Sequence, residues 1–379
     1  MMTDEEVMQK LEEVTKNAQQ HQLETLRSIL HHNGSVRYLQ SFKGSVDVNT
    51  YTSVVPLSTY EDYVEYINQM ADGNRDPLLS VDPLLGFFYS SGTTSSNMKP
   101  KLIPWFDSSL YKATTFIVIQ TNQALLQVAM RKAVIKTLGG PQPELANRIR
   151  LICEGKNWGG IVYRLWPNIH YVRCVSTGSV QQYYQKLKYY AGDVPILGGD
   201  YFSSECCAAL NLDIMQPPET TRYTILPITA YFEFLPFNTN EDNDVSKEAV
   251  ALSSVQVGNM YEVVVTTYNG LYRYKMGDIV RVVGFYNSSP QVEFVMKAPK
   301  SPGEILTEKD LISGVKNFQQ VLKGVMRIDI VKCASFLEQE SRPKQLKVFI
   351  EVQEEDNFLE ELYFIDGEWL GSYVQGAEG

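Results

Sequence analysis

The chain has 379 residues, of which 44% are hydrophobic and 21% charged, and its formal net charge at pH 7 is −10. Such a composition is that of a globular protein, and the length predicts two domains or more. The acidic balance argues against nonspecific binding to nucleic acid or to anionic membranes, because both need a basic surface. We therefore expect neither a nucleic-acid nor a membrane partner, while a local basic pocket remains compatible with this charge.

Cysteine usage and the first residues indicate the compartment. The five cysteines are odd in number and include no C-x-x-C spacing, which is typical of a reducing, intracellular setting. The N-terminus lacks a basic region followed by an apolar core, so no signal peptide is predicted. No apolar run reaches the roughly 18 residues that a membrane span needs. These features predict a cytoplasmic protein.

Helical spacing of apolar residues dominates the first part of the chain. Thr3 and Glu6 form a capping-box pattern, and the helical pattern that follows ends at Gly34, which suits a left-handed C-cap. A second helix is predicted over residues 59–70, and we interpret its stripe of tyrosines as core rather than as a ligand platform. The apolar run over residues 83–88 predicts a strand.

A hydroxyl-rich loop follows that strand. From residue 89 the chain reads Y-S-S-G-T-T-S-S-N-M-K-P-K. Hydroxyls and free backbone N–H groups can bind an anion, and a lysine at the rim adds positive charge. The run is not a Walker loop, since G-x-x-x-x-G-K-[ST] is absent, and on its own it is more often a plain surface loop. The candidate phosphate-binding residues are Ser90, Ser91, Gly92, Thr93 and Thr94, with Lys101 or Lys99 as the working lysine.

Beyond the loop, helices and strands alternate before the texture turns β-rich. Helices are predicted over residues 108–133, 145–152, 180–190 and 310–323. Strands are predicted over residues 160–165, 194–199, 231–237, 261–268, 271–274, 280–286, 292–296, 327–331 and 346–352. Asn269-Gly270 suits the positive φ of a tight turn, and we interpret Cys206-Cys207 as small apolar residues in a packed helix start.

Two further motifs follow the loop in order. Residues 200–205 read D-Y-F-S-S-E, and residues 274–281 read Y-K-M-G-D-I-V-R. Loop, second motif and third motif together resemble the signature of the acyl- and aryl-adenylating superfamily. Within it the chain most resembles the plant auxin-responsive acyl-acid amido synthetase family, through W-G-G-I-V, L-W-P-N, Y-T-I-L-P and Y-F-E-F-L-P between residues 158 and 236.

This resemblance covers about residues 23–311 and implies a fold. We expect the α/β adenylate-forming enzyme fold, which firefly luciferase shares. A large N-terminal α/β domain with a β-rich portion would span residues 1–297. A small α+β C-terminal lid domain, partial in this chain, would span residues 298–379, with K-x-x-G-E at residues 300–304 as the hinge between them.

The resemblance also implies ATP and Mg²⁺ as cofactors and assigns residues to them. Lys101 and Glu205 are the predicted catalytic residues, and Glu205 is the natural Mg²⁺ ligand, because Mg²⁺ takes one or two carboxylates together with substrate phosphates. Asp278 would accept the ribose hydroxyl protons, since a carboxylate only accepts. Glu205 could instead be a solvated glutamate, and Gly277-Asp278 a plain β-turn. The remaining nucleotide-binding candidates are Tyr201, Ser204, Tyr274 and Gly277.

The implied reaction joins a small carboxylic acid to an amino acid. The acid's carboxylate attacks the α-phosphorus of ATP and expels pyrophosphate, and an amine then attacks the acyl-adenylate and releases AMP. The acid would be hormone-like, of the auxin, jasmonate or benzoate type, which would place the protein in plant hormone homeostasis. Two alternatives stay open: a shortened, catalytically inactive member that acts by binding, and a related acyl-CoA ligase.

Three departures from the family pattern bear on these alternatives. The loop before Lys101 is longer than in the family. The connection from the loop to Trp158 is short, which predicts a missing segment near residues 126–128 that would supply one wall of the acid pocket. The chain also ends at Gly379, before the family's C-terminal domain is expected to end.

Overall fold

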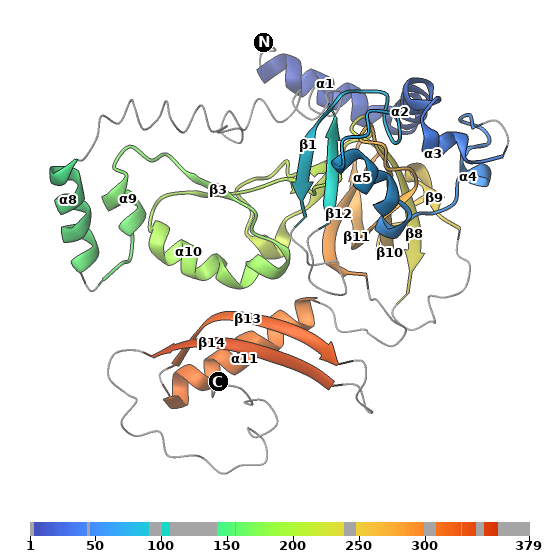
Figure 1. Cartoon of the computed structure of the whole chain (residues 1–379). Coiled ribbons are helices and arrows are strands. Elements are labelled where there is room, and N and C mark those ends of the chain that lie inside the picture. Colours follow the sequence, from blue (N-terminus) through green and yellow to red (C-terminus); the bar gives the residue numbers. More distant parts are fainter. Residues whose placement is uncertain are drawn as a thin grey trace. The chain divides into compact units, whose positions relative to one another are not determined.

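The computed structural model describes residues 4–43, 46–90, 101–106, 142–155, 157–238, 248–298, 308–326, 328–338 and 345–354. The chain divides into two compact units, Met1–Thr307 and Glu308–Gly379, which are described separately (Figure 1). Three predicted features lie outside the described residues: the helix over 108–133, the missing segment near 126–128 and the hinge over 300–304. The predicted domain boundary after residue 297 stays a prediction.

Helices form the first part of unit 1. Asp4 begins the first helix, as the capping-box pattern predicts, and the second helix buries Leu26, Ile29 and Leu30 and contacts strand β8. The predicted left-handed cap is wrong, because Gly34 has a right-handed φ of −59° and the chain continues into another helix. The helices are α1 (Asp4–Lys16), α2 (Ala18–Asn33), α3 (Arg37–Gln40), α4 (Tyr51–Val54), η1 (Tyr60–Asp62) and α5 (Val64–Ala71).

An eight-stranded sheet carries the main core of unit 1. Its strand order is β5-β6-β7-β12-β11-β10-β8-β9, and the paired strands run antiparallel. Figure 1 shows the blue N-terminal helices beside its yellow and orange strands. The strands are β5 (Tyr201–Phe202), β6 (Cys207–Leu210), β7 (Tyr223–Ile225), β8 (Tyr231–Phe237), β9 (Val250–Ala251), β10 (Met260–Thr266), β11 (Tyr274–Tyr286) and β12 (Ser289–Lys297).

The turn between β10 and β11 shows why glycine stands at position 270. Gly270 has a φ of +79°, and a Cβ there would lie 2.3 Å from the Leu79 carbonyl oxygen. The predicted Asn-Gly turn is therefore confirmed, but the predicted strand over residues 271–274 is wrong, because β11 begins at Tyr274. Arg273 just before it has a φ of +47°, which breaks the extended conformation.

Strand β1 (Leu84–Tyr89) pairs with β2 (Leu102–Phe106) in a separate antiparallel sheet, which confirms the strand predicted over residues 83–88. The hydroxyl-rich loop joins these two strands. Tyr89 pairs with Leu102, so the loop begins and ends at the same end of the two strands.

The segment from residue 143 to 198 combines helices with a small parallel sheet. The predicted strand over residues 160–165 is wrong, because Ile161–Leu165 forms helix α9. Gly160 has a φ of +66° and approaches Gly192 closely, which turns the chain into the helix, and a short apolar run cannot distinguish strand from helix. The other elements are α8 (Pro143–Glu154), β3 (Val172–Cys174), η2 (Gly178–Tyr183), α10 (Tyr184–Ala191) and β4 (Ile196–Gly198), with β3 parallel to β4.

The Cys206-Cys207 pair begins a strand, so the predicted helix start is wrong. Cys207 is the first residue of β6 and is buried, which agrees with the interpretation of small apolar packing. Cys206 forms a tight turn with Ser203, whose backbone N–H donates to the Cys206 carbonyl at 3.0 Å. This turn lies at the end of the second motif, residues 200–205.

Unit 2 is an α+β unit, as predicted. Helix α11 (Glu308–Met326) contacts β13 (Ile328–Glu338), which pairs antiparallel with β14 (Gln345–Glu354). These elements contain the predicted helix over 310–323 and both predicted strands, apart from residue 327. Across the described part of both units, no helix has the length and apolar character to cross a bilayer.

Candidate active site

The two ends of the hydroxyl-rich loop are fixed to each other. The Ser90 backbone N–H donates to the Lys101 carbonyl at 2.9 Å, and the Lys101 backbone N–H donates to the Ser90 side-chain oxygen at 2.8 Å. Ser90 and Lys101 are therefore neighbours although eleven positions separate them. The predicted residues Ser91, Gly92, Thr93 and Thr94, and the alternative lysine Lys99, lie outside the described residues.

The Lys101 ammonium reaches the third motif. Its Nζ donates to the Tyr274 hydroxyl at 3.0 Å and lies 5.6 Å from the centroid of the same ring. These two distances place the nitrogen beyond the hydroxyl, so a hydrogen bond and not the ring face holds it on this side. Burial lowers the pKa of Lys101, while the charge of Glu205 opposes that shift.

Glu205 lies on the other side of the Tyr274 hydroxyl. The Tyr274 hydroxyl donates to Oε1 at 3.5 Å, and Ser204 donates to Oε2 at 3.0 Å. The carboxylate is 7% exposed, so the alternative of a freely solvated glutamate is not supported. Each oxygen keeps a lone pair, which is compatible with one Mg²⁺ bond beside substrate phosphates. Among the described residues no group of three or more metal-binding side chains occurs.

Asp278 is held by two donors. The Tyr201 hydroxyl donates to Oδ2 at 2.6 Å, and the Lys297 ammonium forms an ion pair with Oδ1. The aspartate is 3% exposed. Burial raises the pKa of Tyr201 well above its ordinary value, and the Asp278 charge raises it further, so this hydroxyl stays protonated and donates.

Gly277 permits this geometry. It has a φ of +70°, a conformation that disfavours other residues, and its carbonyl accepts from the Ala298 backbone N–H at 2.8 Å. The start of β11 thus lies beside the end of β12, with Asp278 opposite Lys297. Sequence reasoning did not find Lys297, and its place on a strand directly after an apolar run is a signal that could have shown it.

A buried ion pair lies directly behind Tyr274. Arg273 binds both oxygens of Glu233, at 3.0 and 2.9 Å, and also donates to the carbonyls of Thr52 and Val55. Burial raises the pKa of Glu233, and the Arg273 contacts oppose that shift. Sequence reasoning missed this pair, although a glutamate inside the apolar run of residues 231–236 is a recognisable signal.

Asp200 anchors the second motif. Its Oδ2 accepts from Arg173 of β3 at 2.7 Å, and its Oδ1 accepts from the Asn211 backbone N–H at 2.9 Å. The motif thus starts from a fixed carboxylate and ends at the Ser203–Cys206 turn. Tyr201 follows the first of these fixed points, and Ser204 and Glu205 lie within the turn itself, which is how they come to face the third motif.

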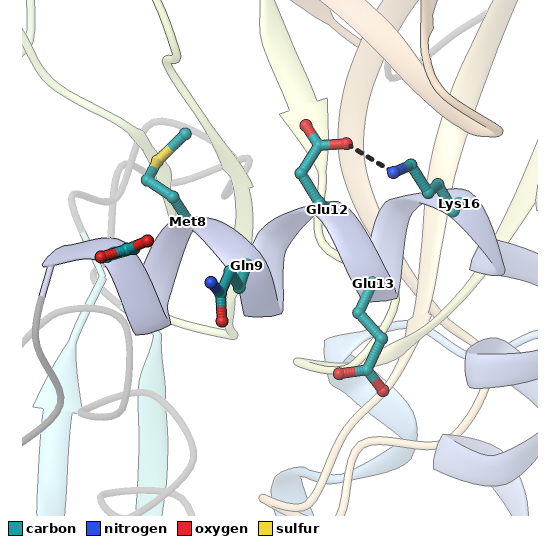
Figure 2. Close-up of a pocket in the computed structure, with 6 residues that line it drawn as sticks. Met8, Gln9, Glu12, Glu13 and Lys16 are labelled. Carbon is teal, nitrogen blue, oxygen red and sulfur yellow. Dashed lines mark ion pairs between the residues drawn. The ribbon is translucent and has the colours of Figure 1, made fainter.

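Two other regions do not join this cluster. Phe232 of β8 is fully buried in the hydrophobic core. The open hollow in Figure 2 lies along α1, where Met8, Gln9 and Glu12 line it and Lys16 pairs with Glu12 at 3.3 Å. That hollow shares no residue with the three motifs.

Comparison with solved structures identifies the class of fold. The structure is similar to GH3.15 acyl acid amido synthetase, with a TM-score of 0.71 and 25% identity, over 91% of this chain and 81% of that one. This is the adenylate-forming fold that the sequence predicts. The GH3 family N-terminal domain matches residues 7–122 and 118–196, and the GH3 family central domain matches residues 223–297. The chain therefore belongs to the GH3 family, as the motif order predicts.

Individual relatives agree. The chain is 46% identical over 215 residues to a probable indole-3-acetic acid-amido synthetase, GH3.6 of Oryza sativa subsp. japonica. The aligned residues cover 55% of this chain and 44% of that protein. It is 28% identical over 512 residues to the jasmonoyl–L-amino acid synthetase GH3.5 of the same plant, covering 97% of this chain and 87% of that protein. These comparisons give no support to the acyl-CoA ligase or to the inactive variant.

The relatives also bear on the missing segment. The alignment with rice GH3.5 runs over 512 positions, more than the 379 residues of this chain, so that relative has internal segments that this chain lacks. The two N-terminal family matches overlap at residues 118–122, just before the gap predicted near residues 126–128. In its alignment with rice GH3.6, the chain spans less than half of that protein's length.

Proposed function

We propose that this protein is an ATP-dependent acyl-acid amido synthetase that adenylates a small carboxylic acid and transfers the acyl group to an amino acid. One observation carries the proposal: three motifs distant in sequence meet in a single cluster. Lys101 of the first motif, Glu205 of the second and Tyr274 of the third form one hydrogen-bonded chain. Membership in the GH3 family and the names of its relatives support the same activity.

The cluster suggests a place for each part of ATP. Asp278 would accept the ribose hydroxyls, because a carboxylate has more lone pairs than Tyr201 and Lys297 use. Lys101 would face the phosphates, since it is a cation that extends from the end of the hydroxyl-rich loop. Glu205 would hold Mg²⁺, which would offset phosphate charge during the reaction.

The proposed reaction needs no nucleophilic side chain. A carboxylate oxygen of the acid attacks the α-phosphorus, and the bond to pyrophosphate breaks. The amine nitrogen of the amino acid then attacks the acyl carbonyl carbon, AMP leaves with its bonding electrons, and the amine loses a proton. In both steps the protein's part is to hold the reactants and offset charge.

We further propose a hormone-like acid of the auxin, jasmonate or benzoate type as the substrate, and the cytoplasm as the compartment. Two rice relatives are named for indole-3-acetic acid and for jasmonate, which supports the first two acid classes. The reducing pattern of cysteine usage supports the compartment.

The test is carboxylate-dependent ATP–pyrophosphate exchange with Mg²⁺, across indole-3-acetic acid, jasmonic acid and 4-substituted benzoic acids. We expect exchange with one acid class, none without acid, and amino-acid-dependent AMP release with the same acid. The Asp82→Asn variant is a matched control, because Asp82 pairs with His32 outside the cluster. Folded protein that exchanges with no acid, and that binds no Mg²⁺-ATP in calorimetry, would contradict the proposal.

A further inference from the structure

One tyrosine of the stripe predicted as core reaches the candidate active site. Tyr60 begins η1, a single turn fixed by a capping box in which the Thr59 backbone N–H donates to Asp62 at 2.7 Å. Tyr63, three residues on, behaves as predicted: it is fully buried, and its hydroxyl donates to the Tyr272 carbonyl at 2.9 Å. Tyr60 is only partly buried and points to β2 instead.

Tyr60 contacts Lys101 in two ways. Its hydroxyl accepts from the backbone N–H of Leu102, the next residue, at 3.0 Å. Its ring lies under the Lys101 ammonium, with 5.6 Å between Nζ and the ring centroid. One side chain thus fixes both the backbone beside Lys101 and the charge at the end of the lysine.

The ammonium also donates to the Tyr274 hydroxyl at 3.0 Å. A free lysine side chain has many rotamers, and ordering it costs conformational entropy. Because the contacts with Tyr60 and Tyr274 already order this side chain in the folded protein, the entropic cost does not weaken the binding of a ligand. The ammonium is then already placed beside Glu205, whose charge acts on it.

We propose that Tyr60 is a positioning residue that holds the Lys101 ammonium between its own ring and the Tyr274 hydroxyl, at the phosphate end of the nucleotide site. This inference rests on the proposed function for its consequence in ATP binding. It also selects Lys101 over Lys99 as the working lysine, because Tyr60 holds the residues at and after position 101.

The first test is steady-state kinetics of exchange in Tyr60→Leu and Tyr60→Phe. Loss of the ring is expected to raise KM for ATP by about 3- to 30-fold, the range of a cation–π contact, with a smaller change in kcat. Tyr60→Phe keeps the ring and is expected to lie closer to the wild type. Tyr66→Leu is the matched control, because Tyr66 belongs to the same stripe but packs edge-on against Tyr38.

A double-mutant cycle separates positioning from general damage. In the Lys101→Met background, Tyr60→Leu is expected to cause no further rise in KM for ATP, because the group that it positions is gone. Equal effects of Tyr60→Leu in both backgrounds would overturn the proposal. Lys99→Met is expected to leave KM for ATP within about twofold of the wild type, because Tyr60 positions Lys101 and not Lys99.

A second measurement does not depend on activity. The rate of Lys101 acetylation by acetic anhydride, followed by peptide mass spectrometry against pH, reports the pKa of that lysine. The cation–π contact with the Tyr60 ring favours the charged ammonium, so Tyr60→Leu, which keeps an apolar side chain at this position, is expected to shift the labelling profile of Lys101 to lower pH, and Tyr66→Leu is not. An unshifted profile in folded Tyr60→Leu would overturn the proposal. A wild type without exchange but with the shift would contradict only the proposed function.

Discussion

Two regions of unit 1 differ in how completely their side chains are buried and hydrogen-bonded. In the eight-stranded sheet, Glu205, Glu233 and Asp278 are at most 7% exposed, and each has a hydrogen-bond partner. In the segment from residue 143 to 198, large apolar side chains are exposed, and helix α8 has no buried residue among those described. The exposed side chains include Leu151 at 71%, Val175 at 61% and Trp166 at 59%.

The exposed segment lies close in sequence to the place where rice GH3.5 has internal segments that this chain lacks. The family matches on either side of residues 118–122 place that gap between β2 and α8, next to the exposed segment. The buried carboxylates of the proposed nucleotide site have their own hydrogen-bond partners, and Arg173 links the segment from residue 143 to 198 to the second motif through Asp200. The proposed nucleotide site is therefore expected to be insensitive to changes of the exposed apolar side chains in that segment, such as Leu151.

The largest test of this contrast removes a buried charge from the sheet. Glu233→Ala is expected to lower the free energy of unfolding by about 3–5 kcal/mol, because it leaves Arg273 buried without its partner. The measurement is the shift of the urea unfolding midpoint. Leu151→Ser in the exposed segment is one control and is expected to change stability by no more than about 0.5 kcal/mol. Glu13→Ala, in the exposed pair with Lys10, is a second control and is expected to leave the unfolding midpoint unchanged. Equal effects in both regions would remove the contrast.

The next test concerns the nucleotide. Asp278→Asn keeps the size of the side chain but replaces a charged carboxylate, whose two oxygens both accept hydrogen bonds, with a neutral amide. We expect the affinity for ATP to fall by about 1.5–3 kcal/mol, or roughly 10- to 100-fold. Calorimetric titration with Mg²⁺-ATP checks this, with Asp82→Asn as the control. Unchanged affinity would show that Asp278 serves the sheet and not the ribose.

A smaller effect is expected at the β10–β11 turn. Gly270→Ala would place a Cβ 2.3 Å from the Leu79 carbonyl oxygen at a φ of +79°, so the backbone must move, at a cost of about 1–3 kcal/mol. Gly258→Ala is the matched control, because Gly258 has a φ of +91° but no atom within 4 Å of its Cβ position. The difference between their thermal unfolding midpoints measures the close approach to Leu79.

The smallest effect has the opposite sign. Burial lowers the pKa of Lys101 in the folded state, so the folded protein binds this proton more weakly than the unfolded chain does. The charge therefore opposes folding at every pH below the folded pKa, and this cost disappears as the pH rises toward the ordinary lysine value of about 10.4. Lys101→Met is expected to raise the melting temperature at pH 7, and its advantage should shrink toward pH 10. A lower melting temperature at pH 7 would contradict this reading of the burial.

Much of the site could be predicted from the sequence because its residues are grouped in short motifs. Glu205 and Asp278 each follow a recognisable local pattern, and the order of the motifs implied that they meet. Tyr60 could not be found in this way, because its spacing is that of the core tyrosine Tyr63. Only the packing of η1 against β2 shows which of them faces the site.

The secondary structure likewise divides into elements that local sequence patterns predicted and elements that they did not. Strands with short apolar runs, such as β8 and β1, were predicted closely, because such a run is a local pattern. Helix α9 was not, because a contact distant in sequence decides it: Gly160 lies against Gly192. The right-handed φ of Gly34 was not predicted either, because the chain continues into helix α3 there. The pairing of Arg273 with Glu233 also joins residues 40 positions apart, which no local pattern encodes.

The reciprocal hydrogen bonds between Ser90 and Lys101 have a consequence for how this family can vary. Because the ends of the loop are held by the β1–β2 sheet, lengthening its interior adds only the entropy of a larger ring, roughly 0.6 kcal/mol for each doubling. A change in the length of the loop can thus leave the lysine at its far end in place. A longer loop, as predicted for this chain, is therefore expected to leave the Lys101 ammonium where Tyr60 and Tyr274 hold it.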